Sequence, residues 1–135
     1  MPHLVILYTA ELDAESDLTA LCRALADTML AVKDEAGKQV FPTGGVRVLA
    51  YPATHSAVAD GRPGCAFAYL NLRMSRGRSE AVKQRAGAAL AATASAHFAP
   101  LLATRHVGIT LQIDEGAEVF DAKLGNLHPL FAKAP

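Results

Sequence analysis

This chain of 135 residues has few cysteines and no excess of charge of either sign. It contains two cysteines, and 13 basic residues balance 13 acidic ones. Cys22 and Cys65 lie far apart, so they predict neither a disulfide framework nor a zinc site, and are typical of small buried residues in a reducing compartment. No stretch has the density of basic residues that nucleic-acid binding requires, which excludes nucleic acid as a partner.

Long hydrophobic runs are also missing. No apolar segment approaches the roughly 20 residues that span a membrane, and the N-terminus lacks the basic and apolar regions of a signal peptide. We therefore expect a cytoplasmic protein with no membrane contact. The five histidines show no spacing typical of metal ligands, so we expect no metal. Hydrophobic residues nevertheless make up 51% of the chain, enough for the core of one domain.

The first half of the chain alternates strand, helix and strand. Residues 4–7 form a continuous apolar run, which predicts a strand covered on both faces, by helices or by a partner subunit. From Leu18 to Val32 apolar residues recur at three- and four-residue steps, which predicts an amphipathic helix. Residues 41–52 contain a Pro/Gly turn that leads into a second strand. The polar connector 54–64 follows, and its Asp-Gly pair is a signal for a hairpin turn.

The second half repeats this order. Cys65–Met74 predicts a strand with alternating sides. Ser79 is suited to cap an alanine-rich helix that reaches to about Thr104. Val107–Ile113 alternates again and predicts a fourth strand, which we expect to end in a turn at residues 114–116.

Each half therefore predicts a βαβ unit, over residues 1–53 and 65–114 of a single domain, 1–135. With right-handed crossovers each unit contains a parallel strand pair. We expect an α+β fold in which the two units form one four-stranded mixed sheet with both helices on one face. The other face of the sheet is also apolar and needs a cover, which favours a homo-oligomer. The C-terminal tail, 115–135, is too apolar to be free, and we expect it to pack on a neighbouring subunit.

Pro2 is the candidate for chemistry at the start of the chain. An initiator methionine is usually removed before proline, so we expect Pro2 to carry a free secondary amine. An α-amino group has a pKa of roughly 7.7–8.0, and modest desolvation leaves it largely neutral at cellular pH. A neutral amine in a dry pocket can act as a general base. On the residues alone, the alternative is an ordinary frayed terminus.

Four landmarks along the chain resemble the 5-carboxymethyl-2-hydroxymuconate isomerases of the tautomerase superfamily. They are MPHLVI at residues 1–6, FPTGGVR at 41–47, GRS at 77–79 and NLHPLF at 126–131. The resemblance covers the whole chain in order and spacing. It implies a tautomerase-like homotrimer of double βαβ subunits, with active sites near the subunit boundaries and with no metal or organic cofactor.

The resemblance also implies roles for three residues. Pro2 would move a proton between carbons of an unsaturated keto or enol acid, and Arg47 and Arg78 match the arginines that bind its carboxylates. On the residues alone, an arginine at the start of a strand, such as Arg47, is more often a solvated edge residue than a ligand-binding one, and the alternative for Arg78 is an ordinary surface arginine in the first turn of a helix. A cation beside the start of a helix opposes the helix dipole, however, which suggests a use for that charge. Arg73 and Arg76 are close enough in sequence to share the role of Arg78.

The sequence leaves three functions open. The first is a cofactor-independent isomerase of aromatic (homoprotocatechuate) catabolism, acting on the acidic small molecule 5-carboxymethyl-2-hydroxymuconate. The second is a tautomerase of the phenylenolpyruvate type, which would need fewer arginines because that substrate is a monoacid. The third is a non-catalytic trimeric binding module on the same scaffold.

Overall fold

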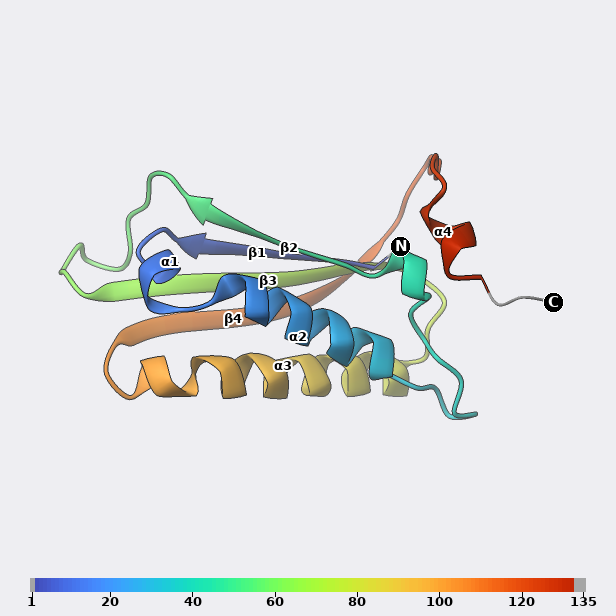
Figure 1. Cartoon of the computed structure of the whole chain (residues 1–135), viewed down its shortest axis with the longest axis horizontal. Helices are drawn as coiled ribbons and strands as arrows, with labels where there is room; N and C mark the ends of the chain where they lie inside the picture. The colour runs from blue at the N-terminus through green and yellow to red at the C-terminus, as the bar shows by residue number, and fades with distance from the viewer. Residues whose placement is uncertain (1, 133–135) are drawn as a thin grey trace.

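The computed structural model describes residues 2–132, which form a sheet with helices on one face (Figure 1). The strands are β1 (His3–Thr9), β2 (Arg47–Ala53), β3 (Cys65–Ser75) and β4 (His106–Gly116). The helices are α1 (Leu12–Glu15), α2 (Leu18–Ala31), α3 (Glu80–Leu102) and α4 (Leu127–Leu130), with one 3₁₀ turn, η1 (Thr43–Gly45). The two long helices, α2 and α3, lie side by side beneath the sheet in the view of Figure 1.

The sheet has the strand order β2-β1-β3-β4. β1 pairs in parallel with β2, and β3 pairs in parallel with β4, while β1 and β3 are antiparallel. This confirms the predicted mixed four-stranded sheet of two βαβ units. The predicted hairpin in the connector is wrong. Because β2 and β3 occupy opposite sides of β1, they cannot pair, and Asp60 instead accepts a hydrogen bond from Arg62 within the connector.

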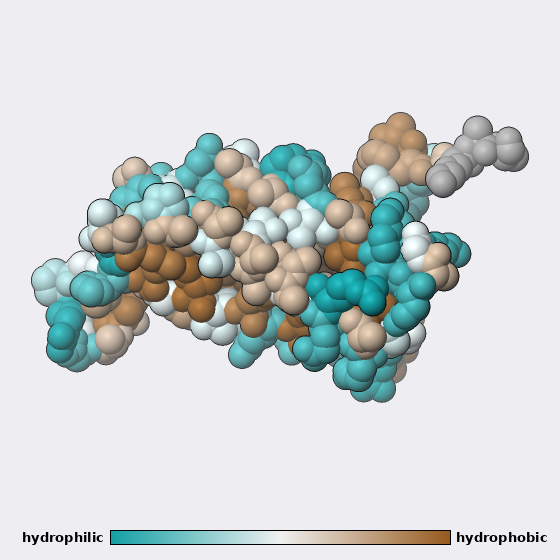
Figure 2. Space-filling model, turned by 90° about the horizontal axis from the view of Figure 1, so that it is seen from below, coloured by the Kyte–Doolittle hydropathy of each residue, from teal (hydrophilic) through white to brown (hydrophobic). Residues whose placement is uncertain are grey.

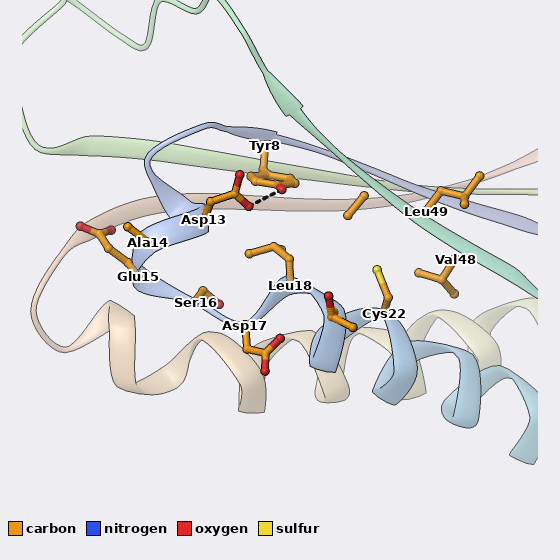
Figure 3. A pocket seen from close by; sticks show the side chains of 12 residues that line it. Tyr8, Asp13, Ala14, Glu15, Ser16, Asp17, Leu18, Cys22, Val48 and Leu49 are labelled. Carbon is orange, nitrogen blue, oxygen red and sulfur yellow. Dashed lines mark hydrogen bonds between the residues drawn. The ribbon is translucent and has the colours of Figure 1, made fainter.

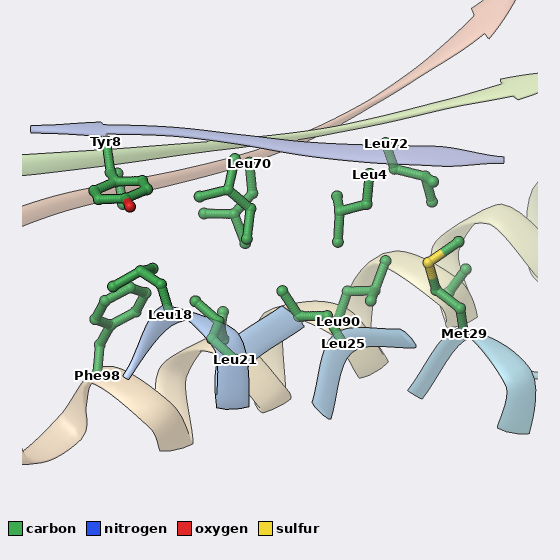
Figure 4. Close-up of a cluster of buried hydrophobic side chains, with 14 of the residues drawn as sticks. Leu4, Tyr8, Leu18, Leu21, Leu25, Met29, Leu70, Leu72, Leu90 and Phe98 are labelled. Carbon is green, nitrogen blue, oxygen red and sulfur yellow. The ribbon is translucent and has the colours of Figure 1, made fainter. Parts of the chain in front are cut away.

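The core lies between the sheet and the two long helices. Alternate residues of β1 and β3 point toward α2 and α3, and leucines of both helices point back at them (Figure 4). The largest fully buried side chains include Leu4, Ile6, Leu70 and Leu72 of the sheet and Leu21, Leu25, Met29, Leu90 and Phe98 of the helices. The predicted apolar stripe from Leu18 to Val32 is therefore confirmed as the buried side of α2.

Side-chain caps begin both long helices. The carboxylate of Asp17 accepts a hydrogen bond from the Ala20 amide at 3.0 Å, and the Ser79 hydroxyl accepts one from the Val82 amide at 3.2 Å. The cap predicted at Ser79 is confirmed. The turn predicted at residues 114–116 is wrong, because β4 stays paired with β3 as far as the register Ser75↔Gly116.

A histidine contact joins the start of α2 to α3. His97 lies on α3, and its Nε2 is 2.7 Å from the hydroxyl of Ser16. Its ring packs edge-on against Phe98, with the centroids 5.0 Å apart. Burial lowers the pKa of His97 from its ordinary value of 6.5, against a smaller opposing effect of Asp17. The folded protein therefore favours the neutral ring.

This shift predicts that the protein loses stability in mild acid. The unfolded chain binds the His97 proton more tightly than the folded chain, so the free energy of unfolding falls as the pH drops below about 6.5. His97→Gln, which keeps a hydrogen-bonding side chain without the titration, should show a smaller fall. Urea denaturation at pH 7.5 and pH 5.5 measures the difference. The exposed His55 supplies the control, and an equal change in His55→Gln would contradict the assignment.

The face of the sheet away from the helices is uncovered and carries large hydrophobic side chains. Leu7, Leu49, Tyr51 and Phe67 have 36–50% of their surface exposed there. The helical side differs: hydrophobic residues form a band along its middle (Figure 2), and half of the exposed residues of α3 are alanines. Single methyl groups at a surface are ordinary, whereas a group of large side chains on one face marks a surface that another molecule covers. Within residues 2–132 no helix is long and apolar enough to cross a membrane.

Candidate active site

The predicted site residues cluster at one end of the sheet. Pro2 is buried and stands directly before β1, the second strand of the sheet, flanked on both sides. The next residue, His3, is in register with Arg47 of β2 and with Arg73 of β3. A residue fixed at the end of an interior strand has little freedom to move, which suits a group that must hold one position during a reaction.

A cavity of about 430 Å³ opens beside this strand end. Its wall comes from the starts of β1 and β2, from Arg73 near the end of β3, and from the segment between β4 and α4. The lining residues are His3, Arg47, Arg73, Glu118, Asp121, Ala122, Lys123, Leu124, Gly125, Leu127 and His128. In Figure 1 the N-terminus and α4 lie at the same end of the molecule. The tail of the chain thus forms one wall of the cavity, which the sequence did not predict.

Of the three predicted site residues in the described chain, Arg47 lines this cavity, whereas Pro2 and Arg78 lie outside its wall. Arg47 is half-buried and donates a hydrogen bond to the carbonyl of Gly45 at 3.2 Å. Burial and, secondarily, the charge of Arg47 lower the pKa of His3, so the imidazole beside Arg47 is neutral at neutral pH. The cavity therefore presents a fixed guanidinium next to a neutral ring.

Arg78 lies in the loop between β3 and α3. Its guanidinium carbon is 4.9 Å from the centre of the Phe41 ring, and it donates to the carbonyl of Ser75 at 3.1 Å. Burial lowers the pKa of Arg78, but an arginine side chain stays charged in proteins. The contact with Phe41 brings two landmarks of the sequence, residues 41–47 and 77–79, together at this end of the molecule. A guanidinium over an aromatic face is held in position and keeps further donors for a ligand.

The tail is fitted closely against η1. A Cβ added at Gly44 would lie 3.0 Å from Cα and 3.2 Å from Nδ1 of His128. Since a backbone atom cannot yield without moving the segment, the absence of a side chain at residue 44 lets α4 approach. This explains the first glycine of the Gly-Gly pair in the landmark before Arg47.

Gly44→Ala should therefore displace the tail from the cavity. We expect the free energy with which the tail packs against η1 to weaken by about 1 kcal/mol. This corresponds to a roughly fivefold rise in KM for a substrate bound in the cavity. Hydrogen exchange of residues 117–132 should quicken in parallel. Gly87→Ala is the control, because its methyl group would meet only the terminal Cδ1 of Ile113, at 3.3 Å. Unchanged exchange in Gly44→Ala would contradict the close fit.

A second cavity, of about 810 Å³, lies at the other end of β1. In Figure 3 the Tyr8 hydroxyl points at Asp13 and donates a hydrogen bond of 2.6 Å, while Val48 and Leu49 of β2 form the facing wall. Burial, reinforced by the bond to Asp13, raises the pKa of Tyr8 to about 12. A phenol held in its neutral form by an internal partner is poorly placed to exchange protons with a ligand. This cavity also lacks any of the predicted site residues.

The residues that the structure describes offer no group of three or more His, Cys, Asp or Glu side chains placed to hold a metal ion. Cys22 and Cys65 are free thiols, each half-buried. The charged and titratable side chains in the cavity wall are two guanidinium groups, two imidazoles, one amine and two carboxylates.

Comparison with known proteins points the same way. The family model of 5-carboxymethyl-2-hydroxymuconate isomerase matches residues 2–131. A 5-carboxymethyl-2-hydroxymuconate Delta-isomerase of Escherichia coli is 28% identical over 131 residues, which cover 97% of this chain and 99% of that protein. A crystal structure of a 5-carboxymethyl-2-hydroxymuconate delta-isomerase is 61% identical with a TM-score of 0.95, covering 100% of this chain and 95% of that one. One from Deinococcus radiodurans R1 is 35% identical with a TM-score of 0.85, covering 98% and 95%.

Proposed function

The chain belongs to the 5-carboxymethyl-2-hydroxymuconate isomerase family, and we propose that it isomerises 5-carboxymethyl-2-hydroxymuconate with Pro2 as general base and acid. The observation that supports this most is the position of Pro2, buried at the end of an interior strand beside a cavity with arginines in its wall. The family match and the relatives named above make the chain an isomerase of aromatic catabolism. The role of Pro2 is our inference.

The reaction requires one group to give and take a proton. The lone pair of the Pro2 nitrogen takes a proton from one position of the conjugated acid, and the electrons of that bond move into the carbon chain as the double bond shifts. The ammonium so formed returns the proton to another carbon. Burial and nearby cations favour the neutral amine, which is the form that starts the cycle. No external oxidant or reductant enters, because the product is an isomer of the substrate.

Arg47 and Arg78 bind the carboxylates of the substrate in this proposal. Guanidinium groups hold planar carboxylates through paired hydrogen bonds. They also stabilise the negative charge that builds on oxygen in the transition state. Arg47 is on the cavity wall, and Arg78 is held near the same strand end by Phe41.

The assembly proposed is a homotrimer, for which the uncovered face of the sheet is the support. The tail supplies further apolar surface: Val119, Phe120 and Leu124 have at least 85% of their surface exposed in the single chain. We propose that the tail, residues 115–135, packs on a neighbouring subunit, while α4 contacts η1 of its own chain. Residues 133–135 of this tail lie outside the described residues. The free thiols are consistent with assembly in the cytoplasm.

A spectrophotometric isomerisation assay tests the function. The purified protein should convert 5-carboxymethyl-2-hydroxymuconate many times faster than phenylenolpyruvate, with no loss of rate in the presence of EDTA. A preference for phenylenolpyruvate would instead identify a tautomerase of that type. Turnover of neither compound, by a protein whose intact mass shows a free Pro2, would favour a binding module.

A further inference from the structure

A row of three side chains crosses the sheet at the cavity. Arg47, His3 and Arg73 are in register on β2, β1 and β3. Residues in register on neighbouring strands point to the same face of a sheet, and strands lie about 4.8 Å apart. The two arginines therefore flank His3 on one face, with their Cα atoms roughly 10 Å from each other. All three residues line the cavity.

Arg73 has no internal partner among the residues that the structure describes. Its register neighbour on β4 is Asp114, which is the obvious candidate for an ion pair. The Asp114 carboxylate instead accepts a hydrogen bond of 2.8 Å from the side chain of Asn71. Arg73 is also exposed to the cavity. Its five N–H donors are thus available to a ligand.

The carboxylates of the tail do not fully neutralise the positive charge of Arg47 and Arg73. Of the two carboxylates in the cavity wall, that of Asp121 accepts a hydrogen bond of 2.5 Å from Lys123. The other, of Glu118, is folded back against Gly116. The wall thus contains three cationic side chains against two carboxylates. Two guanidinium groups facing one space repel each other unless an anion lies between them, so the row favours a ligand with negative charge at more than one point.

From this arrangement we infer that Arg73 binds a further carboxylate of the substrate, in addition to those assigned to Arg47 and Arg78, and selects polycarboxylates over monocarboxylates. Arg47 holds one carboxylate, and Arg73 holds another on the far side of the neutral His3. The inference rests on the proposed function, since it assigns a substrate-binding role within the same cavity. It adds Arg73, as a residue that determines specificity, to Pro2, Arg47 and Arg78, which the sequence singled out.

The test compares Arg73→Gln with Arg76→Gln. Arg76 is exposed in the loop between β3 and α3 and lies outside the cavity wall. Its replacement lowers the charge of the molecule by the same amount as Arg73→Gln but removes no side chain from the cavity. For 5-carboxymethyl-2-hydroxymuconate we expect kcat/KM to fall about tenfold in Arg73→Gln, mainly through KM, and to stay within about twofold in Arg76→Gln. For phenylenolpyruvate, a monocarboxylate, both variants should match the parent. Arg73→Lys should recover part of the loss.

An equal fall in kcat/KM on both substrates in Arg73→Gln, or no fall on 5-carboxymethyl-2-hydroxymuconate, would overturn the inference. A binding measurement separates this failure from failure of the proposed function. Titration calorimetry with cis,cis-muconate, a conjugated diacid, needs no turnover. Binding that weakens about tenfold in Arg73→Gln would support the subsite even if the parent protein isomerised nothing. Equal binding by the parent and by Arg73→Gln would refute it even if the parent were an active isomerase.

Discussion

Replacing Pro2 with alanine should lower kcat about a hundredfold, at the low end of what general acid–base catalysis contributes. Alanine still supplies an α-amine, so the loss reflects the rigid secondary amine and its fixed direction. Alanine is also small enough for the initiator methionine to be removed, which intact mass checks. Steady-state kinetics on 5-carboxymethyl-2-hydroxymuconate measures the effect.

Two controls accompany this variant. Pro63→Ala, in the exposed connector at the other end of the molecule, should keep the parent rate. Size-exclusion chromatography should show the same assembly for Pro2→Ala as for the parent, because the change removes no large side chain. An unchanged kcat in processed Pro2→Ala would exclude the proline mechanism.

Replacing Arg47 with glutamine should reduce kcat/KM about a hundredfold, since it removes a charge-assisted contact inside a partly buried site. Glutamine keeps the start of the aliphatic chain and an uncharged amide, but it is shorter than arginine and cannot offer the paired donors of a guanidinium. The loss should fall on KM and kcat together if Arg47 also stabilises the developing oxyanion. The same substitution at Arg78 tests the second arginine.

The matched control is Arg23→Gln. Arg23 lies on the exposed side of α2 and is paired with Asp27, so its removal alters the net charge far from the cavity. It should leave kcat/KM within about twofold, as for most surface substitutions. Retention of full activity by Arg47→Gln would remove Arg47 from the site.

Much of the fold follows from local patterns. The three- and four-residue steps of α2 and the alternation in β3 and β4 each reflect one buried side, so the sequence predicts them directly. The short helix α1 was not predicted, because four residues carry no period. The hairpin was predicted wrongly, because an Asp-Gly pair reports a local turn, whereas the pairing of β2 is decided by the competition for the edges of β1.

The site was predicted in part, for similar reasons. Pro2, Arg47 and Arg78 were predicted through the family landmarks, and their roles stay predictions; of the three, Arg47 lies in the cavity wall. The cavity itself was not, because it depends on where the tail returns, and residues 118–128 have no periodic pattern. Arg73 was named only as a neighbour of Arg78. Its place across His3 from Arg47 depends on the register of three strands, which no single segment contains.

The proposed mechanism depends on the free amine of Pro2, so blocking this amine tests the mechanism most directly. Inserting a glutamate between Met1 and Pro2 yields a chain that keeps Met1 and buries the proline nitrogen in a peptide bond; Met1 itself lies outside the described residues. Intact mass defines the amino terminus of each preparation, and the isomerisation rate is measured on the same sample. Turnover should require the free Pro2 amine and be lost in the extended chain, while the substrate still binds. Turnover by the extended chain at the rate of the processed one would contradict it.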